Sequence, residues 1–282
     1  ISGYGGGLYL NNSSAPTLEN LIIDGNHATQ GGGIYSEIGS DNSLIKNVII
    51  SNNTASWGGG GCLGSNVVFE NVTITKNYAP KGGGIYISVN NSEQHGILFS
   101  DTEKCNIYEN YALNGTDIYI NGDLSPQLNV VVDTFTVATP TDYYAYPISN
   151  ITFGITNHTV DPIVGDIYVD PTGSNDNSGT SPASPYKTIS YAMLSAFANS
   201  SNPGTIHLAD GTYSPSTNGE YFPLGVKDDV SIIGSSVEGT ILSGDSTTTI
   251  LGGTADDILI STLTVRNGDT GIDISGTGTL SN

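Results

Sequence analysis

The sequence Gly31-Gly32-Gly33-Ile34-Tyr35 decides the fold, because the chain repeats it. The same pattern returns at residues 5–9 and 82–86, and in degraded form at residues 58–62 and 115–119. An Asn stands five residues before four of these runs, and an Ala follows each Asn by two residues. These Asn residues are Asn26, Asn53, Asn77 and Asn110. Their spacings of 27, 24 and 33 residues indicate a repeat architecture.

Each period contains one short run of β-branched residues or leucine. The clearest runs are residues 21–23, 48–50 and 72–74, and they are flanked by Asn, Gly and Ser, which is typical of strands and turns. Helical repeats need two runs of good helix formers, and leucine-rich repeats need a Leu-x-x-Leu-x-Leu motif; the sequence contains neither. We therefore predict an all-β fold, a parallel β-helix (solenoid) with two or three strands per coil, stacked at roughly 4.8 Å per coil.

Stacked coils place equivalent side chains above one another, which predicts ladders of Asn side chains. The amide of each Asn can donate to the carbonyl of the Asn on the next coil, and a buried amide without a partner costs on the order of 1–3 kcal/mol. A second column lies six residues earlier in three coils, and we expect Asn71 to point inward. This column consists of Asn20, Asn47 and Asn71. The alternative for any one Asn is a turn residue in the left-handed conformation.

The composition limits the partners of this 282-residue chain. Seven basic residues against 27 acidic ones give a net charge of −20. This balance disfavours nucleic acid, anionic lipid and anionic polysaccharide, which need clusters of Lys and Arg. No run of 18 apolar residues exists, so we predict no membrane span in this segment. The sequence has no signal peptide, and Ile1 already belongs to a repeat, which indicates a cut or processed N-terminus.

The few charges and the many Ser, Thr, Asn and Gly residues favour an extracellular or cell-surface location. Several Asn-x-Ser/Thr triplets are candidate glycosylation sites. They begin at Asn12, Asn52, Asn90, Asn114, Asn150, Asn157 and Asn199. Cys105 aligns with inward positions of other coils, and Cys62 lies near the register of residues 34–35. Buried free thiols and a disulfide between adjacent coils both remain open.

The character of the chain changes at Asp166. We interpret residues 1–165 as coils and the closing edge of a β-helix, with a bulge or loop at residues 139–147. Residues 166–282 are then the N-terminal cap and first coils of a β-helix. A helix is expected at residues 189–198. Its apolar face comprises Ile189, Met193, Leu194 and Phe197.

Residues 167–213 resemble the start of pectate-lyase-like right-handed β-helix proteins. The motifs are Tyr168-Val169-Asp170-Pro171, Pro185-Tyr186-Lys187-Thr188-Ile189 and Gly211-Thr212-Tyr213. The resemblance implies a right-handed solenoid whose first coil is capped by the short helix. Coils then precede the cap in the chain, which is an inverted order. Either the sequence is a window on tandem solenoids, or it is the repeating unit of an end-to-end assembly.

The fold alone does not decide the function, because it hosts lyases, hydrolases, adhesins and structural proteins. Lyases that act on uronates need a Ca²⁺ cluster and a basic residue, but Arg266 is the only Arg and has no carboxylate on its strand face. Glycosidases need carboxylates on consecutive coils, and Asp228/Asp229 and Asp256/Asp257 are spaced by 28 residues. We interpret these pairs as turn residues; the alternatives are a weak cation site and catalysis.

Two further groups of residues are candidates for binding. Asp170, Asn175 and Asp176 in the cap loop offer hard oxygen ligands for Ca²⁺, although we expect no cofactor to be required. One Tyr per coil forms a predicted outward column that could stack on sugar rings or on another solenoid, or simply stabilise the strands. The column consists of Tyr9, Tyr35, Tyr86 and Tyr119.

The sequence therefore predicts a non-enzymatic, extracellular structural or adhesive β-solenoid. Its expected partners are further copies of itself, associated head to tail in a filament or surface layer, and carbohydrate. The alternative is a polysaccharide-binding or polysaccharide-degrading β-helix protein of the lyase or hydrolase type.

Overall fold

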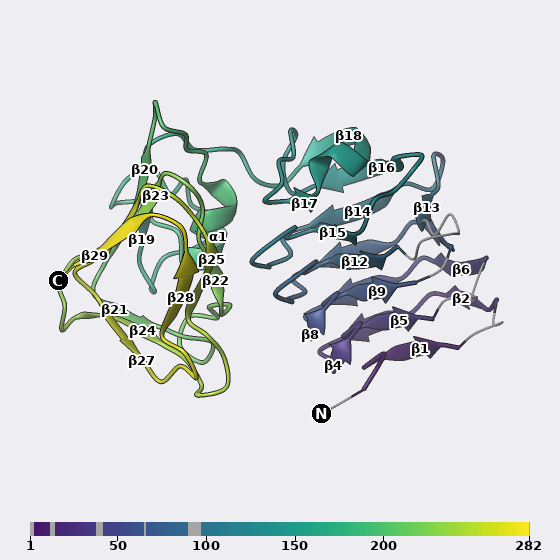
Figure 1. The fold of residues 1–282 in the computed structure, drawn as a ribbon, viewed down its shortest axis with the longest axis horizontal. Helices are drawn as coiled ribbons and strands as arrows, with labels where there is room; N and C mark the ends of the chain where they lie inside the picture. Colours follow the sequence, from purple (N-terminus) through teal and green to yellow (C-terminus); the bar gives the residue numbers. More distant parts are fainter. Residues whose placement is uncertain (1–2, 12–14, 38–41, 65, 90–96, 282) are drawn as a thin grey trace. The chain divides into compact units, whose positions relative to one another are not determined.

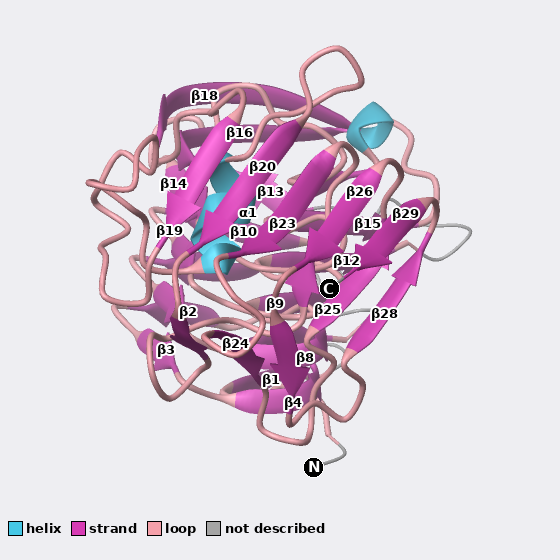
Figure 2. Cartoon of the chain, turned by 90° about the vertical axis from the view of Figure 1, so that its left-hand side faces the viewer, coloured by secondary structure: helices cyan, strands magenta, loops and turns pink. Residues whose placement is uncertain are grey.

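The structure is a computed structural model that describes residues 3–11, 15–37, 42–64, 66–89 and 97–281. The fold is all-β, with about nine solenoid turns counted over the chain, and the paired strands are parallel (Figure 1). The chain divides into two compact units, Ile1–Thr159 (unit 1) and Val160–Asn282 (unit 2). Strands account for most of the regular structure in both units, as the magenta arrows of Figure 2 show.

Unit 1 is built from three long sheets, each of which takes one strand from successive coils. The first sheet has the order β1 (Leu8–Leu10), β5 (Ile34–Ser36), β9 (Gly61–Leu63), β12 (Ile85–Ser88), β15 (Ile118–Asn121) and β17 (Ala145–Tyr146). The second has the order β13 (Ile97–Phe99), β10 (Val67–Glu70), β6 (Ser43–Lys46) and β2 (Thr17–Glu19). The third has the order β18 (Ile151–His158), β16 (Leu128–Phe135), β14 (Cys105–Tyr108), β11 (Thr73–Thr75), β7 (Ile49–Ser51) and β3 (Ile22–Asp24).

A short fourth sheet in unit 1 pairs β4 (His27–Gln30) with β8 (Thr54–Trp57). The core of the unit consists of coil-equivalent aliphatic residues, because alternate residues of each strand point inward. Ile50, Ile74 and Ile107 stand at equivalent positions of three consecutive strands of the third sheet, and each is at most 1% exposed. Repetition of one residue class at one position therefore gives a continuous core along the solenoid.

The segment 139–147 is a loop through residue 144, as predicted, and only its end departs from that prediction. Residues Ala145–Tyr146 form β17, which pairs with β15 in the same register as the earlier coils. The expected Gly run is missing here, yet Asp117 N and Ile118 N donate to Tyr144 O at 2.9 and 3.1 Å. The backbone of the neighbouring coil thus makes residue 145 follow the solenoid even though its own sequence lacks the repeat signature.

Unit 2 also has three sheets. The first has the order β19 (Asp166–Val169), β20 (Gly204–Leu208), β23 (Val230–Gly234), β26 (Ile258–Ser261) and β29 (Gly278–Ser281). The second has the order β21 (Gly211–Tyr213), β24 (Thr240–Ser243) and β27 (Thr264–Arg266). The third has the order β22 (Leu224–Gly225), β25 (Leu251–Thr254) and β28 (Ile272–Ser275).

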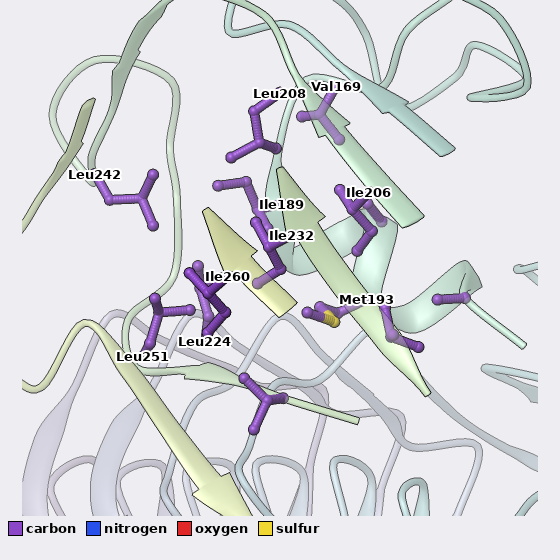
Figure 3. Close-up of a cluster of buried hydrophobic side chains, with 14 of the residues drawn as sticks. Val169, Ile189, Met193, Ile206, Leu208, Leu224, Ile232, Leu242, Leu251 and Ile260 are labelled. Carbon is purple, nitrogen blue, oxygen red and sulfur yellow. The ribbon is translucent and has the colours of Figure 1, made fainter. Parts of the chain in front are cut away.

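Helix α1 (Ile189–Ser195) packs on the core of unit 2 (Figure 3). Thr188 caps it, because the Thr188 side chain accepts from Tyr191 N. The carboxylate of Glu220 accepts from Ile189 N at 2.7 Å and from Ser190 N at 2.8 Å. Two otherwise unpaired N–H groups of the first turn are thereby satisfied. Ile189 and Met193 enter the same hydrophobic cluster as Ile206 and Ile232, which fits the expected capping role.

The helix is shorter than the predicted range of residues 189–198. It ends at Ser195, and Ala196 already has an extended backbone. Phe197, which we expected on the apolar face, lies outside the helix and is 47% exposed. The cause is strand-like pairing with the chain before β19, since Ile163 N donates to Ser195 O and Phe197 N donates to Ile163 O. Among the described residues, no helix has the length and apolar character needed to cross a bilayer.

Candidate functional site

The Asn residues of the repeat form a hydrogen-bonded ladder inside unit 1. Asn26 Nδ2 donates to Asn53 Oδ1, Asn53 Nδ2 to Asn77 Oδ1, and Asn77 Nδ2 to Asn110 Oδ1, each at 3.0 Å. Each acceptor oxygen also receives the backbone N–H of the preceding Asn, at 2.9, 3.0 and 3.1 Å. Asn53, Asn77 and Asn110 are 0% exposed. We call Asn26, Asn53, Asn77 and Asn110 the Asn ladder.

The Asn ladder explains the last glycine of each Gly run. A Cβ placed on Gly33 would lie 3.0 Å from Asn53 Nδ2, and a Cβ on Gly60 would lie 3.0 Å from Asn77 Nδ2. The same position in the next coil, Gly84, lies against Asn110 Nδ2, again at 3.0 Å. A Cβ at each of these positions would also lie 2.5–2.6 Å from a backbone oxygen of the next coil. The third glycine therefore leaves room both for that backbone and for the ladder amide.

The first glycine of each run has a different role. Gly31, Gly58 and Gly82 have φ values of 64°, 65° and 64°, in the left-handed region where a side chain is strained. The degraded run at residues 115–119 keeps this requirement, because Gly115 has a φ of 58°. It replaces only the second and third glycines, by Thr116 and Asp117.

The Asn ladder ends on Asp117, which occupies the third-glycine position of its coil. Asn110 Nδ2 donates to Asp117 Oδ1 at 3.0 Å, where the earlier rungs use the next Asn. Asp117 is 0% exposed, and burial raises the pKa of its carboxyl group to about 7, although hydrogen bonds from Thr136 and Asn110 act in the opposite direction. The buried acid thus supplies the final acceptor that the next coil lacks.

This environment makes the stability of unit 1 depend on pH. Below about pH 4 Asp117 is protonated in both the folded and the unfolded chain. Between pH 4 and 7 the folded chain retains a proton that the unfolded chain releases, so the free energy of unfolding falls as the pH rises. A folded-state pKa of about 7 against 3.8 for a freely exposed Asp corresponds to a loss of about 4 kcal/mol across this window.

We expect Asp117→Asn to remove this part of the pH dependence, because its amide oxygen still accepts from Asn110 and cannot ionise. At pH 8 the variant should be more stable than the parent chain, and at pH 4 the two should be similar. Urea unfolding followed by the fluorescence of Trp57, the single Trp of the chain, reports on unit 1 at both pH values. Parallel pH profiles for the two proteins would contradict this assignment.

The second Asn column lies on the surface instead. Asn47 Nδ2 donates to Asn20 Oδ1 at 3.3 Å and Asn71 Nδ2 donates to Asn47 Oδ1 at 2.8 Å. All three residues are exposed and have left-handed φ values of 58°, 53° and 49° for Asn20, Asn47 and Asn71. The expectation that Asn71 points inward is therefore wrong, because the left-handed corner turns its side chain out of the coil. Here a turn conformation and stacked amides occur together.

The tyrosines stack along one sheet, and we call Tyr9, Tyr35, Tyr86, Tyr119 and Tyr146 the Tyr column. The ring centroids of Tyr9 and Tyr35, and of Tyr86 and Tyr119, are 5.4 Å apart, and Tyr146 follows at 5.2 Å from Tyr119. Tyr9 is 42% exposed, but Tyr119 is only 8% exposed. Tyr119 stands in register with Tyr86 and Tyr146 and stacks on both, so it shares their outward face. Its exposure is low because Tyr146 and the Lys81 ammonium cover it; Lys81 Nζ lies 5.4 Å from the ring centroid.

The paired carboxylates of unit 2 lie in stacked turns. Asp228 Oδ1 accepts from Asp256 N at 2.8 Å, and Asp256 Oδ1 accepts from Thr277 N at 2.7 Å. Asp229 and Asp257 have left-handed φ values of 59° and 56°, as turn residues often do. Arg266 is exposed at the end of β27. These carboxylates therefore organise the backbone of successive coils.

The cap loop uses the oxygens of its candidate ligands for local hydrogen bonds. Asp170 Oδ1 accepts from Thr172 N at 2.7 Å, and Asn175 Oδ1 accepts from Lys187 N at 3.0 Å and from Thr188 N at 3.1 Å. Asp176 Oδ2 accepts from Ser174 Oγ at 3.2 Å. Within the described part of the chain, no three His, Cys, Asp or Glu side chains are grouped to hold a metal ion. Ca²⁺ binding by this loop stays a prediction.

The candidate glycosylation sites differ in environment. Asn52, Asn114, Asn157 and Asn199 are exposed, and Asn150 is half-buried. The amides of Asn52 and Asn150 are hydrogen bonded, to Asp24 Oδ1 at 2.7 Å and to Gly122 O at 3.0 Å. Asn12 and Asn90 lie outside the described residues. Glycosylation at all of these positions stays a prediction.

Both cysteines are buried free thiols. Cys105 accepts from Val72 N at 3.5 Å, in the inward position that the alignment predicted. Cys62 pairs in register with Tyr35 on one side and with Tyr86 on the other, so of the two positions considered, residues 34 and 35, it corresponds to residue 35. Burial raises the pKa of the Cys62 thiol to about 12, so the group stays protonated at neutral pH.

Sequence reasoning missed three residues that matter in the structure. The sequence does contain a signal for Asp117, which replaces the third glycine of its Gly run. It also contains one for Tyr146, which follows Tyr119 by about the length of one coil. Glu220 gave no local signal, because its contact with the first turn of α1 joins residues 30 and 31 positions apart.

Comparison with protein families agrees with this architecture. A family model described as "Right handed beta helix region" matches residues 1–160, more than half of the chain. The chain therefore belongs to the right-handed β-helix family, and its fold is consistent with the pectate-lyase-like resemblance. Residues 171–277 match a second model, described as "Protein of unknown function (DUF1565)". Searches of curated proteins and of solved structures found no match.

Proposed function

We propose that the protein is a non-enzymatic structural or adhesive β-solenoid that works outside the cell. The observation that carries this proposal is the use of equivalent polar side chains on successive coils to bind one another. The Asn ladder runs along the buried interior of unit 1 and ends on Asp117. Buried networks whose polar groups are all hydrogen bonded make a fold rigid. A rigid fold suits a protein that resists mechanical force or holds a binding surface away from the cell.

The carboxylates in unit 2 support a structural role over a catalytic one. The alternative, polysaccharide degradation, would use carboxylates on consecutive coils as acid and base or nucleophile. Asp228 and Asp256 instead accept backbone N–H groups of the next coil. The extracellular location is supported by the low charge content of 12% and by exposed Asn-x-Ser/Thr sites such as Asn114 and Asn199.

End-to-end association of copies is the second part of the proposal. Within the described residues, strands β1, β2 and β3 of unit 1, and β27, β28 and β29 of unit 2, are each the last strand of their sheet. An edge strand presents unpaired N–H and C=O groups that can pair with another chain. Leu280 on β29 is 63% exposed, which leaves an apolar side chain on such an edge.

Assembly through this edge predicts an effect of Leu280→Lys, because edge lysines block strand pairing. We expect the parent chain to form end-to-end oligomers in negative-stain images and in sedimentation, and the variant to remain monomeric. Val164→Lys is the matched control, since Val164 is 59% exposed and lies outside the strands. Dispersed monomers of the parent chain at all concentrations would contradict end-to-end association.

A polysaccharide depolymerisation screen, with and without Ca²⁺, tests the enzymatic alternative. The proposal expects no chain shortening of neutral or uronate polymers in either condition. Ca²⁺-dependent release of oligosaccharides would overturn the non-enzymatic assignment and direct attention to the cap loop around Asp170 and Asn175.

A further inference from the structure

A second set of side chains packs diagonally on the Tyr column. The residue immediately before each Gly run belongs to this set. It packs on the side chain that occupies the Tyr-column position in the following coil. Tyr4 lies against Tyr35 with ring centroids 4.7 Å apart, and Trp57 lies 6.5 Å from Tyr86. Lys81 covers Tyr119 in the same way. Large side chains thus fill three of the four diagonal positions of this surface.

The pattern breaks at one coil. The column residue there is Cys62, which pairs in register with Tyr35 and Tyr86. Its diagonal partner is Gln30, whose Oε1 lies 3.7 Å from Cys62 Sγ. A pair of small or polar side chains therefore stands where the other coils carry one or two large ones.

The break leaves a hollow of about 260 Å³. The residues that surround it come from β4, β5, β8, β9 and β12. They include Gln30, Tyr35, Trp57, Cys62, Tyr86 and Ser88. In the strand register Tyr35 lies one coil before Cys62 and Tyr86 one coil after it, with Trp57 packed on Tyr86. Tyr35 is therefore one wall, Trp57 and Tyr86 are the other, and the 2% exposed Cys62 is the floor between them.

We propose that this hollow, which we call the Cys62 slot, binds the ring of a neutral hexose in its pyranose form. The ring would lie between Tyr35 and the Trp57–Tyr86 wall, in the place of the missing tyrosine. The inference rests on the proposed adhesive role and names the ligand class that such an adhesive surface recognises.

The size of the Cys62 slot fits a single sugar ring. Two coil rises of about 4.8 Å separate Tyr35 from Tyr86, which gives a gap on the order of 10 Å. A flat aromatic ring between two walls needs about 7–8 Å at carbon–carbon contact distances of 3.5–4.0 Å. The puckered, saturated ring of a hexose is thicker and fills more of the gap. The volume of 260 Å³ lies just below the range of pockets for drug-sized ligands, about 300–1,000 Å³.

The chemistry of the lining favours a neutral sugar. Aromatic faces offer apolar surface for the C–H groups of the ring, and weak C–H contacts of this kind are favourable. The Gln30 amide, the Ser88 hydroxyl and the tyrosine hydroxyls can exchange hydrogen bonds with sugar hydroxyls. Burial raises the pKa of Tyr35 and of Tyr86 to about 12, so both phenols remain donors at neutral pH. Among the described residues that line the hollow there is no Lys or Arg for a uronate.

Trp57 makes the slot directly observable, because it is the only Trp of the chain. The full chain is titrated with glucose, galactose, mannose and N-acetylglucosamine, with galacturonate and p-cresol as a charged and an aromatic comparison. The expected result is a saturable change in Trp57 emission with at least one neutral sugar. Ligand-observed NMR provides a second readout that does not depend on Trp57.

Cys62→Tyr is the decisive variant, because it restores the missing rung and fills the slot without removing any contact of the Tyr column. We expect it to keep the fold and to weaken sugar binding by about tenfold or more, which is 1.4 kcal/mol or more. Tyr146→Ala, at the far end of the Tyr column, is the matched control and should leave binding within about twofold. Tyr86→Ala, followed by NMR, removes one wall and should also weaken binding if Cys62→Tyr does not fold.

Three results would overturn the assignment. They are the absence of saturable binding by every neutral sugar, unchanged binding in the folded Cys62→Tyr or Tyr86→Ala variant, and tighter binding of p-cresol or galacturonate than of any neutral sugar. The failure of this inference can be separated from that of the proposed function. Loss of sugar binding leaves the effect of Leu280→Lys on assembly unchanged, and enzymatic cleavage would appear in the depolymerisation screen.

Discussion

Replacing Asn77 by Ala is expected to lower the free energy of unfolding of unit 1 by about 3–6 kcal/mol. Asn77 Nδ2 donates to Asn110 Oδ1, Ile50 O and Thr75 O at 3.0, 2.9 and 3.1 Å. Its Oδ1 accepts from both Asn53 N and Asn53 Nδ2 at 3.0 Å. The truncation leaves these buried partners without hydrogen bonds, and each unsatisfied buried group costs about 1–3 kcal/mol.

The matched control is Asn71→Gly in the exposed column. Asn71 donates to Asn47 as Asn77 does to Asn110, but on the surface, where water replaces a lost partner. Glycine accepts the left-handed φ of 49° at this position. We expect a loss of no more than about 1 kcal/mol. Urea unfolding followed by Trp57 fluorescence compares the two variants, and equal losses would show that burial does not decide the strength of the Asn ladder.

The second large effect concerns two adjacent glycines. Gly60→Ala places a Cβ 2.6 Å from Gly84 O, 2.9 Å from Ile74 Cγ2 and 3.0 Å from Asn77 Nδ2. The backbone of the next coil and the ladder amide must both shift. We expect a loss of about 3 kcal/mol or more, since overpacking alone costs about 1–3 kcal/mol and displaced ladder bonds add to it.

Gly61→Ala, one residue further on, should instead raise the free energy of unfolding. The nearest atoms to a Cβ on Gly61 are 3.8 Å away, which is ordinary van der Waals contact. Removal of glycine freedom from the unfolded chain then stabilises by about 0.4–1 kcal/mol. Thermal and urea unfolding of both variants measure the contrast. Similar behaviour of Gly60→Ala and Gly61→Ala would mean that the Gly run serves only to bend the chain.

The period of the sequence was enough to predict coils and the register between them. Parallel strands one coil apart must align, so residues 27 or 24 positions apart, such as Asn26, Asn53 and Asn77, meet directly. The short apolar runs likewise predicted the strands of the third sheet of unit 1. This information is local and is repeated in each coil, so it survives the degraded Gly run at residues 58–62.

The direction of a side chain was harder to predict than its register. Asn71 and Asn77 share the same spacing to their column partners, but a left-handed φ at Asn71 turns that column outward. Phe197 and Tyr146 were assigned wrongly for a related reason, because pairing with a distant segment determined the backbone there. The Cys62 slot was invisible in the repeat alone, since it depends on the diagonal contact between Gln30 and Cys62.

The polarity of the Asn ladder bears on how this chain can change in evolution. Asn53 and Asn77 each receive two hydrogen bonds from the preceding Asn and give two to the following one, so a coil that carries Asn and a small third residue is interchangeable with its neighbours. An in-frame gene duplication of 24–33 residues upstream of Asp117 would add one more Asn to the Asn ladder. Every buried amide would still have its hydrogen-bond partner. A duplication downstream of Asp117 would not lengthen the Asn ladder, because the ladder ends at this residue. Homologous chains are thus expected to vary in length by whole coils on one side of this acid only.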